Sequence, residues 1–352
     1  MSITTESELH QFLSTKDIPC HEMEALTGGS ANFCWRIETQ LGKRSIVKHA
    51  EPFVRIMPDM PLPVERMDYE HLALTTIPGI IPADEYIRLP QLYNYFPEEH
   101  VIHMSDGGRQ ELRESYKNGD AIDIPFLGQR IGFWLAGLHR ETSKPETLEF
   151  VKRTFDNKVA QSVFRYTYNG LASILTHHGY DPALGERINS KFGTEDALDK
   201  TCLCHGDFWL SNIQLENEDP DIQVEEGEST KLRTPVLTII DWENVRVGNG
   251  ATDVGRLAAD SWLLDRFNGG KGMFENFLKA YLAKRPLKQH DKIRLVVQFA
   301  VHIIFYSRMR WTDEEGTKEL VRIGKAMLEA VEAEDWKSLG TGPLARVFSG
   351  SE

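Results

Sequence analysis

The most informative part of the chain reads Leu203-Cys204-His205-Gly206-Asp207-Phe208-Trp209-Leu210-Ser211-Asn212-Ile213. Its histidine, aspartate and asparagine have the spacing H-x-D-x-x-x-x-N. An aspartate at the start of such a loop can accept the proton of a hydroxyl group, and an asparagine five residues later can turn back to ligate magnesium. Asp207 and Asn212 are our candidates for these two tasks.

A second motif follows in Leu237-Thr238-Ile239-Ile240-Asp241-Trp242-Glu243. It combines an apolar strand with a carboxylate at the strand's end, where Asp241 would bridge magnesium to the phosphates of ATP. Either motif alone could equally have a structural role. Asp207 would then be a turn aspartate, and Asp241 a strand-ending aspartate that caps its neighbours. The two motifs occur together, however, and after a strand-rich block with a lysine. The combination therefore indicates phosphoryl transfer, which needs these parts and little covalent chemistry from the protein.

Lys48 lies inside the short apolar strand Ser45-Ile46-Val47-Lys48-His49-Ala50. Strand lysines usually extend to solvent. This one occupies the third-strand position that matches a lysine holding the α- and β-phosphates. Its partner carboxylate should lie on the following helix, and we choose Glu70, with Glu65 as the alternative. A solvated helix charge is the less favoured explanation for either glutamate.

The turn Gly28-Gly29-Ser30-Ala31-Asn32 could lay backbone N–H groups over the phosphates of a nucleotide. It lacks the G-x-G-x-x-G pattern, so an ordinary hairpin turn explains it as well when it is taken alone. It gains weight only from the motifs downstream.

Hydrophobic patterning predicts an α+β protein in which a strand-rich block precedes a helical one. The strands are expected at 21–27, 33–39, 44–50, 91–96 and 100–105, and they form a five-stranded antiparallel block. One main helix is expected at 64–76 after a proline-rich break, and a short helix at 5–15 with Thr4 or Thr5 as its cap. Helical periodicity then covers 124–140, 147–176 and the chain from 251 onward, and a short strand pair surrounds the HGD segment. The polar run 216–234 is expected to be an exposed loop.

Composition narrows the functional class. The 352 residues carry 40 basic and 53 acidic side chains, a formal net charge of −13. Such a chain is expected to repel nucleic acid and anionic lipid. The N-terminus does not read as a signal peptide, and no apolar run is long enough to span a bilayer. The cysteines are Cys20, Cys34, Cys202 and Cys204, too few ligands in sequence for a metal site, so we expect reduced thiols in a cytoplasmic protein.

These motifs together resemble the aminoglycoside phosphotransferase/choline kinase family of small-molecule kinases. The matching residues span almost the whole chain in the family's order: Gly28-Gly29-Ser30-Ala31-Asn32, Lys48, Gly137-Leu138-His139, His205-Gly206-Asp207 through Asn212, and Ile240-Asp241-Trp242-Glu243 followed by Asp253. The resemblance implies a bilobal protein-kinase-like fold. We expect an N-terminal ATP-binding lobe at 1–105 and a mainly helical catalytic and substrate-binding lobe at 106–352.

The resemblance also implies roles for individual residues. Asp207 would be the catalytic base, Asn212 and Asp241 the Mg²⁺ ligands, and Lys48 would contact the phosphates of ATP. The strand that runs into the hinge would hold adenine through its backbone near His103, Met104 and Ser105.

The acceptor is less well defined by the sequence. The stretch 47–55 is similar to methylthioribose kinases, whereas HGDFWLSN is similar to fructosamine kinases. A sugar-like hydroxyl of the methylthioribose type is our first expectation, and an aminoglycoside or amino alcohol the second. A catalytically silent kinase-like binding protein is the alternative from another class. Monomer and homodimer both remain open.

Candidate acceptor-binding residues follow from their position or from an unusual aromatic and arginine-rich stretch near the C-terminus: Trp209, Glu243, Arg308, Arg310 and Trp311. Core aromatic residues and solvated arginines explain that stretch more simply. His139 and His302 are expected to be hydrogen-bonded structural histidines rather than ligands.

Overall fold

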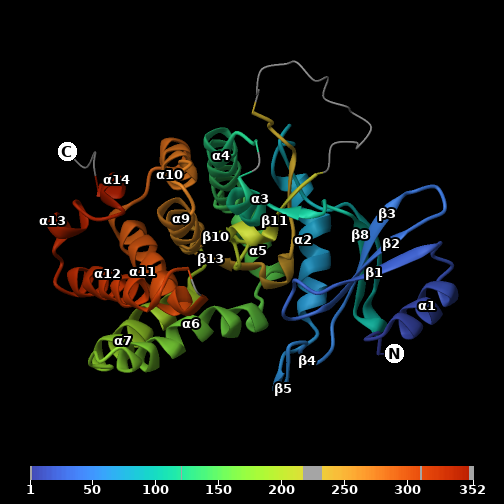
Figure 1. Ribbon diagram of the computed structural model, residues 1–352, viewed down its shortest axis with the longest axis horizontal. Helices are drawn as coiled ribbons and strands as arrows, with labels where there is room; N and C mark the ends of the chain where they lie inside the picture. Colours follow the sequence, from blue (N-terminus) through green and yellow to red (C-terminus); the bar gives the residue numbers. More distant parts are fainter. Residues whose placement is uncertain (1, 120, 217–231, 310, 349–352) are drawn as a thin grey trace.

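The protein has a strand-rich part and a helical part, as Figure 1 shows for the computed structural model. The structure describes residues 2–119, 121–216, 232–309 and 311–348. Most of the polar run 216–234 and the candidate Arg310 therefore lie outside the described residues. Among the described helices, none is long and apolar enough to cross a bilayer.

The strand-rich part is built on a five-stranded antiparallel sheet, as predicted. In spatial order its strands are β1 (Glu22–Leu26), β2 (Phe33–Glu38), β3 (Arg44–His49), β8 (Val101–Ser105) and β7 (Leu92–Phe96). The register pairs Lys48 with Cys34 on one side and with Ile102 on the other. Lys48 thus lies in the centre of the sheet, where its backbone is held from both sides.

Helix α1 (Glu6–Thr15) covers this sheet near the N-terminus (Figure 1). It begins at Thr5 with a capping box, in which the Glu8 N–H donates to Thr5 Oγ1 at 3.3 Å and the Thr5 N–H donates to Glu8 Oε2 at 2.9 Å. Its apolar face packs with Trp35, Ile37 and Val47 in a small core of its own.

The main helix of this part, α2 (Arg66–Ile80), stands between the sheet and the helical part (Figure 1). It is longer than predicted, because Pro78 lies in its last turn and does not end it earlier. The proline-rich break before it contains a small hairpin, which the sequence pattern did not predict, formed by β4 (Phe53–Val54) and β5 (Met57–Pro61).

The helical part packs around α4 (Ile124–Thr142), α9 (Gly250–Phe267), α10 (Met273–Lys284) and α11 (Gln289–Phe305), with α10 on α4 and α11 on α9. Their buried faces belong to one large apolar core. Around them lie α3 (Leu112–Asn118), α5 (Pro145–Thr154), α6 (Lys158–His177), α7 (Ala183–Ile188), α8 (Thr194–Leu198), α12 (Glu314–Glu332), α13 (Trp336–Leu339) and α14 (Ala345–Phe348).

The helix expected at 147–176 is in fact two helices, α5 and α6, so that prediction is wrong in one respect. The chain leaves the helix at Phe155, which is fully buried. Asn157 then caps α6 by accepting from the Ala160 N–H at 2.9 Å. Its amide nitrogen donates to the carbonyls of Glu243 and Val245 at 3.1 and 3.0 Å. The break therefore ties α6 to the segment that follows Asp241.

Short strands carry the two motifs. In one pair, β10 (Cys202–Cys204) is antiparallel to β13 (Arg246–Gly248). A four-stranded sheet has the order β6 (Ile87–Arg88), β12 (Leu237–Ile239), β11 (Ile213–Leu215) and β9 (Gln110–Glu111). The HGD loop leaves β10 and returns into β11, and Asp241 follows β12, so the two motifs end beside each other.

Candidate active site

Lys48 is the centre of a buried ion cluster. Its Nζ lies 2.6 Å from Glu70 Oε2, in direct contact with Asp241 Oδ1, and 3.7 Å from Glu243 Oε2. The lysine therefore pairs with Glu70 and not with Glu65, which is exposed at the N-terminal end of α2. β3, α2 and the end of β12 each supply a charge, so three distant segments meet at one point.

The charges of this cluster alter one another's pKa values. Burial raises the pKa of Glu70 to about 7, although Lys48 opposes this. Burial also works against ionisation of Asp241, but the contact with Lys48 outweighs it and holds the pKa of Asp241 below its usual value. Burial disfavours the charged lysine, yet Asp241 and Glu70 raise the Lys48 pKa well above normal. Lys48 is therefore a permanent cation.

Asp241 has a left-handed backbone, with φ 65° and ψ 55°. Non-glycine residues seldom adopt this conformation, and aspartate is one of the few that does so at small cost. The chain turns there from β12 into a short helical turn, Trp242–Asn244, whose first N–H donates to Glu70 Oε1 at 3.3 Å. The turn aims the carboxylate of Asp241 at Lys48.

Asp253, near the start of α9, holds the backbone of the HGD loop. Its carboxylate accepts from the N–H groups of His205 at 2.8 Å and Gly206 at 3.1 Å. Gly206 has φ 83°, and a Cβ there would lie 2.1 Å from the Asn244 carbonyl oxygen, so only glycine fits. These contacts fix the loop without using the side chain of Asp207.

His205 has a structural place in the loop. Its Nε2 lies 2.9 Å from the Ile240 carbonyl, and its Nδ1 lies 3.2 Å from the Asp207 N–H. Burial lowers the pKa of His205. This fits a neutral ring that donates from Nε2 and accepts at Nδ1, which links the HGD loop to the end of β12.

Asp207 is paired with Arg256 on α9, which contacts its Oδ1. Asn212 donates its amide to the Asp207 carbonyl at 2.9 Å and to Asp207 Oδ2 at 3.2 Å. Burial raises the pKa of Asp207, while Arg256 limits the rise. The carboxylate is thus held in one orientation by two partners and remains 21% exposed.

The turn 28–32 is tied to the β4–β5 hairpin. Arg55 donates to the carbonyls of Thr27 and Gly29, and the Ile56 N–H donates to the Ser30 carbonyl at 3.2 Å. Gly28, Gly29 and Ser30 are exposed, whereas Asn32 is buried. Asn32 donates to Glu243 Oε2 and accepts from Arg66 Nε at 3.0 Å. The turn is therefore anchored to the ion cluster at its C-terminal end.

Glu243, which we predicted to contact the acceptor, lies in the ion cluster, and its contact with the acceptor stays a prediction. Its carboxylate is 5% exposed and lies among Asn32, Arg66 and Lys48. It therefore adds a carboxylate to the ion cluster, between Lys48 and Arg66.

The predicted adenine segment lies within the sheet. His103 and Met104 pair with both β3 and β7, and the Ser105 N–H donates to the Gln91 carbonyl at 2.8 Å. The His103 ring contacts Ser45 Oγ at 2.9 Å and the Asn94 amide at 3.2 Å. The backbone of His103 and Met104 is thus engaged in the sheet, and the contact of this segment with adenine stays a prediction.

Half-buried aromatic rings gather around Trp209, two residues after Asp207. Trp209 lies 5.7 Å from Tyr306, between ring centroids. The guanidinium of Arg113 lies 5.7 Å from the Trp209 ring and 4.3 Å from the Trp311 ring. Arg308 is exposed and lies over the Phe305 ring. Two of the candidate acceptor residues, Trp209 and Trp311, are thus brought together through Arg113.

Several polar atoms in this region are buried without a hydrogen-bond partner among the described residues: Trp209 Nε1, Trp311 Nε1, both ring nitrogens of His302, Arg113 Nε and Asp260 Oδ1. Burial lowers the pKa of His302 well below normal, helped by Arg256 and Arg113. A cluster of buried polar groups without partners is costly unless something binds there.

Sequence reasoning missed Arg256, Arg113 and Asp260. One signal for two of them was available, since Asp253, Arg256 and Asp260 are three and seven residues apart on α9 and so share one helical face. That face meets the HGD loop: Asp260 Oδ2 accepts from the Leu210 N–H at 3.0 Å. No comparable local signal marks Arg113.

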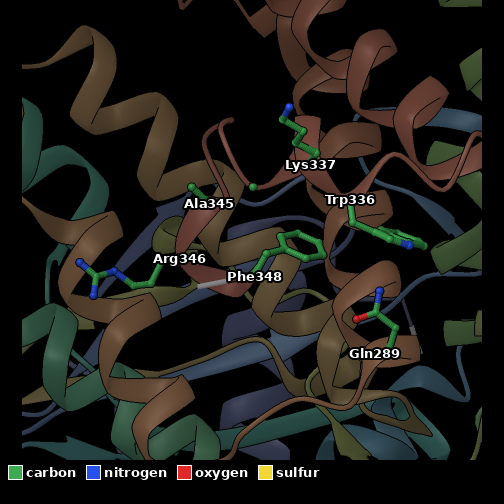
Figure 2. Close-up of a pocket in the computed structure, with 7 residues that line it drawn as sticks. Gln289, Trp336, Lys337, Ala345, Arg346 and Phe348 are labelled. Atoms are coloured by element: carbon green, nitrogen blue, oxygen red, sulfur yellow. The ribbon is translucent and has the colours of Figure 1, made fainter. Parts of the chain in front are cut away.

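Two surface hollows lie elsewhere. The larger, about 860 Å³, is lined by α11, α13 and α14, where Gln289, Trp336 and Phe348 face one another (Figure 2). The smaller, about 300 Å³, lies beside the β2–β3 turn and is lined by Gly42, Arg44, Asp106, Gly108 and Glu216. Neither is lined by Lys48, Asp207 or Asp241.

No family model matches the chain. It is 27% identical over 346 residues to the 4-hydroxytryptamine kinase of Psilocybe cubensis, covering 92% of each chain. Among solved structures, it aligns with the gentamicin–APH(2″)-IIa complex at a TM-score of 0.52 and 17% identity, covering 99% of both chains. It aligns with a choline/ethanolamine kinase family protein from Mesorhizobium loti at a TM-score of 0.51 and 14% identity, covering 99% of this chain and 98% of the other.

Proposed function

We propose that this chain, which has the fold of the aminoglycoside phosphotransferase/choline kinase family, is a small-molecule kinase that transfers the γ-phosphoryl group of ATP to the hydroxyl of a hydroxylated aromatic amine. The observation that carries the proposal is the convergence of Lys48, Glu70 and Asp241 beside the loop that presents Asp207. Residues 1–105 would form the ATP-binding lobe and 106–352 the catalytic and acceptor-binding lobe.

Asp207 would act as the base for the acceptor hydroxyl. A base works best when its pKa is near the working pH but its carboxylate still dominates. Burial raises the Asp207 pKa toward that range, and Arg256 keeps it from rising further. The pairing with Arg256 and Asn212 also fixes the direction of the carboxylate, which a general base needs.

The donor set beside it fits magnesium, which prefers oxygen ligands. Asn212 uses its amide nitrogen toward Asp207, which turns its side-chain oxygen the other way. Asp241, with its depressed pKa, offers carboxylate oxygens at neutral pH. We propose these two residues as the Mg²⁺ ligands. When bound, the ion would neutralise phosphate charge.

Lys48 would contact the phosphates of ATP. It is a buried cation on the central strand, and Glu70 positions its ammonium from the side opposite Asp241. The exposed turn at Gly28, Gly29 and Ser30 would cover the phosphates with backbone N–H groups, because it is fixed to Arg55 and, through Asn32, to the same cluster.

The acceptor side favours a flat aromatic molecule. Trp209, Tyr306 and Trp311 are all half-buried, so each has ring surface left to contact a ligand. Burial raises the pKa of Tyr306, and Arg256 and Asp207 both act on it, so its hydroxyl lies near the catalytic pair. The relative named above is called a 4-hydroxytryptamine kinase, and hydroxylated indole amines have this shape. A methylthioribose-type sugar, an amino alcohol and an aminoglycoside remain alternatives.

A substrate panel tests the proposal. 4-Hydroxytryptamine, methylthioribose, choline, ethanolamine and an aminoglycoside are each offered with MgATP, and phosphorylated product is measured by mass spectrometry. We expect 4-hydroxytryptamine to have the highest kcat/KM. Trp209→Ala should lower that value by about tenfold, mainly through KM, since ring contacts contribute about 1 kcal/mol each.

Exposed aromatic residues offer a control, and Phe150→Ala should leave kcat/KM unchanged because this side chain is 41% exposed on α5. A higher kcat/KM for the sugar or the amino alcohols would contradict the aromatic acceptor but keep the kinase. Failure to bind or hydrolyse MgATP at all would favour the catalytically silent binding protein.

A further inference from the structure

Two thiols and an imidazole meet under the HGD loop. Cys202 and Cys204 are alternate residues of β10, so their side chains lie on the same face of the strand. His139 comes to them from α4. All three residues are fully buried, and their ligand atoms lie within 4.8 Å of one another. The sequence alone offered only the two thiols, and the fold adds the third ligand.

The spacing suits a shared metal ion better than a disulfide. Two sulfurs bound to one zinc ion at about 2.3 Å each are roughly 3.8 Å apart in tetrahedral geometry, and a bound nitrogen is about 3.5 Å from each. Small side-chain rotations would therefore close the site. Alternate Cα atoms of a strand are about 6.7 Å apart, near the upper limit for a disulfide.

His139 is oriented as metal-binding histidines usually are. Its Nε2 lies 3.3 Å from Asp253 Oδ2, and its Nδ1 lies 2.9 Å from the Tyr281 hydroxyl. If Nε2 carries the proton and donates a hydrogen bond to Asp253, the lone pair of Nδ1 is available to a metal ion. In the structure this lone pair accepts a hydrogen bond from the Tyr281 hydroxyl. A carboxylate behind the imidazole fixes the ring and strengthens it as a ligand.

We propose that Cys202, Cys204 and His139 bind Zn²⁺, with the Tyr281 hydroxyl as the nearest candidate for a fourth ligand. This site shares no residue with the proposed magnesium ligands, Asn212 and Asp241. It would connect α4 to β10 directly beneath the catalytic loop, since Cys204 precedes His205 and Asp253 holds both His139 and the loop. The proposal does not depend on the identity of the acceptor.

Cobalt tests the site directly, because Co²⁺ bound to thiolate gives charge-transfer bands in the near ultraviolet and bound to oxygen alone gives none. As the ligands are buried, Co²⁺ is supplied in the growth medium, and the purified reduced protein is measured in excess Mg²⁺. We expect close to one Co²⁺ per chain, with thiolate bands that disappear when Zn²⁺ replaces it.

Variants localise the ligands. Cys202→Ser and Cys204→Ser should each lose most of the bands and bind the metal at least about tenfold more weakly. Cys20→Ser, which alters a thiol outside the cluster, should keep both. Circular dichroism confirms that each variant is folded. Bands as strong as those of the wild type in Cys202→Ser and Cys204→Ser would overturn the proposal.

The wild-type protein provides a test that needs no variant. Protein from zinc-supplemented medium is dialysed against metal-free buffer, and its metal content is measured by mass spectrometry. Retention of about one Zn²⁺ per chain supports the site. Complete loss of zinc, together with no thiolate bands from cobalt, would show that the two cysteines are only core residues.

Discussion

Among single residues, the contact between Arg256 and Asp207 has the most direct consequence for the proposed chemistry. The two residues are 49 positions apart in the chain, and α9 brings them together under the HGD loop.

The Arg256–Asp207 pair predicts a change in pH dependence. Arg256 opposes the effect of burial on the Asp207 pKa, so Arg256→Met should raise that pKa further. Catalysis needs the ionised carboxylate, and the acid limb of the kcat profile should therefore move to higher pH. At a pH on that limb, kcat should fall by about tenfold or more.

Arg322→Met, on the exposed surface of α12, is the matched control and should keep the wild-type profile. Retention of part of the activity by Arg256→Lys would support a role for the charge. An unchanged acid limb in Arg256→Met would show that Arg256 does not tune Asp207.

The candidate catalytic residues could be named from the sequence where their neighbours in the chain are distinctive. This holds for Lys48 and Asp241, which meet in the structure, and for Asn212, which holds Asp207. Arg256 could not be assigned to Asp207 in this way, because their contact depends on how α9 packs under the HGD loop.

At the scale of elements, most helices and strands could be predicted because amphipathic periodicity is a local property. The five strands of the main sheet were confirmed, with α1 and its threonine cap. The break between α5 and α6 was not predicted, because burial of Phe155 and the contacts of Asn157 with the Glu243 segment outweigh helical periodicity there. The β4–β5 hairpin was missed because prolines hid the strand pattern.

The packing of α4 on α10 predicts a sharp contrast between two glycines of the same helix. A Cβ at Gly132 would lie 2.5 Å from the Phe277 carbonyl oxygen, whereas nothing lies within 4 Å of a Cβ at Gly137. Gly132→Ala should therefore lower the free energy of unfolding by about 1–3 kcal/mol. Gly137→Ala should be neutral or raise it by up to about 1 kcal/mol.

Urea unfolding followed by circular dichroism measures both changes. Equal destabilisation by the two substitutions would mean that α4 and α10 do not approach each other this closely.

At the scale of the whole molecule, the order of a strand-rich and a helical part was confirmed, and so was the resemblance to the aminoglycoside phosphotransferase/choline kinase family. The contacts between the two parts could not be predicted. Asn32 meets Glu243 across 211 residues of chain, and Lys48 meets Asp241 across 193. Such pairs leave no periodic signal in the sequence.

Because the proposed nucleotide site joins both parts, MgATP should stabilise the whole protein. A ligand at about 100 times its Kd contributes roughly 2.7 kcal/mol, which should raise Tm by several degrees. Asp241→Asn keeps the shape and the left-handed backbone but replaces the carboxylate of a proposed magnesium ligand with a neutral amide, and it should lose most of this rise. Differential scanning fluorimetry with ATP, with and without Mg²⁺, measures the effect.

Asp156→Asn, a change at a surface carboxylate, should behave as wild type. A full MgATP-dependent rise in Asp241→Asn would remove Asp241 from the proposed magnesium ligands.

Substitution of Asp207 shows most sharply whether this residue serves a kinase reaction on a small hydroxylated molecule. Transfer of the γ-phosphoryl group from ATP to 4-hydroxytryptamine is followed by product mass for the wild-type protein and for Asp207→Asn. We expect phosphorylated product from wild type and a fall in kcat of about 10²–10⁴-fold in Asp207→Asn, with the MgATP-dependent rise in Tm retained. A variant that phosphorylates the acceptor at the wild-type rate would contradict a role for Asp207 as the base.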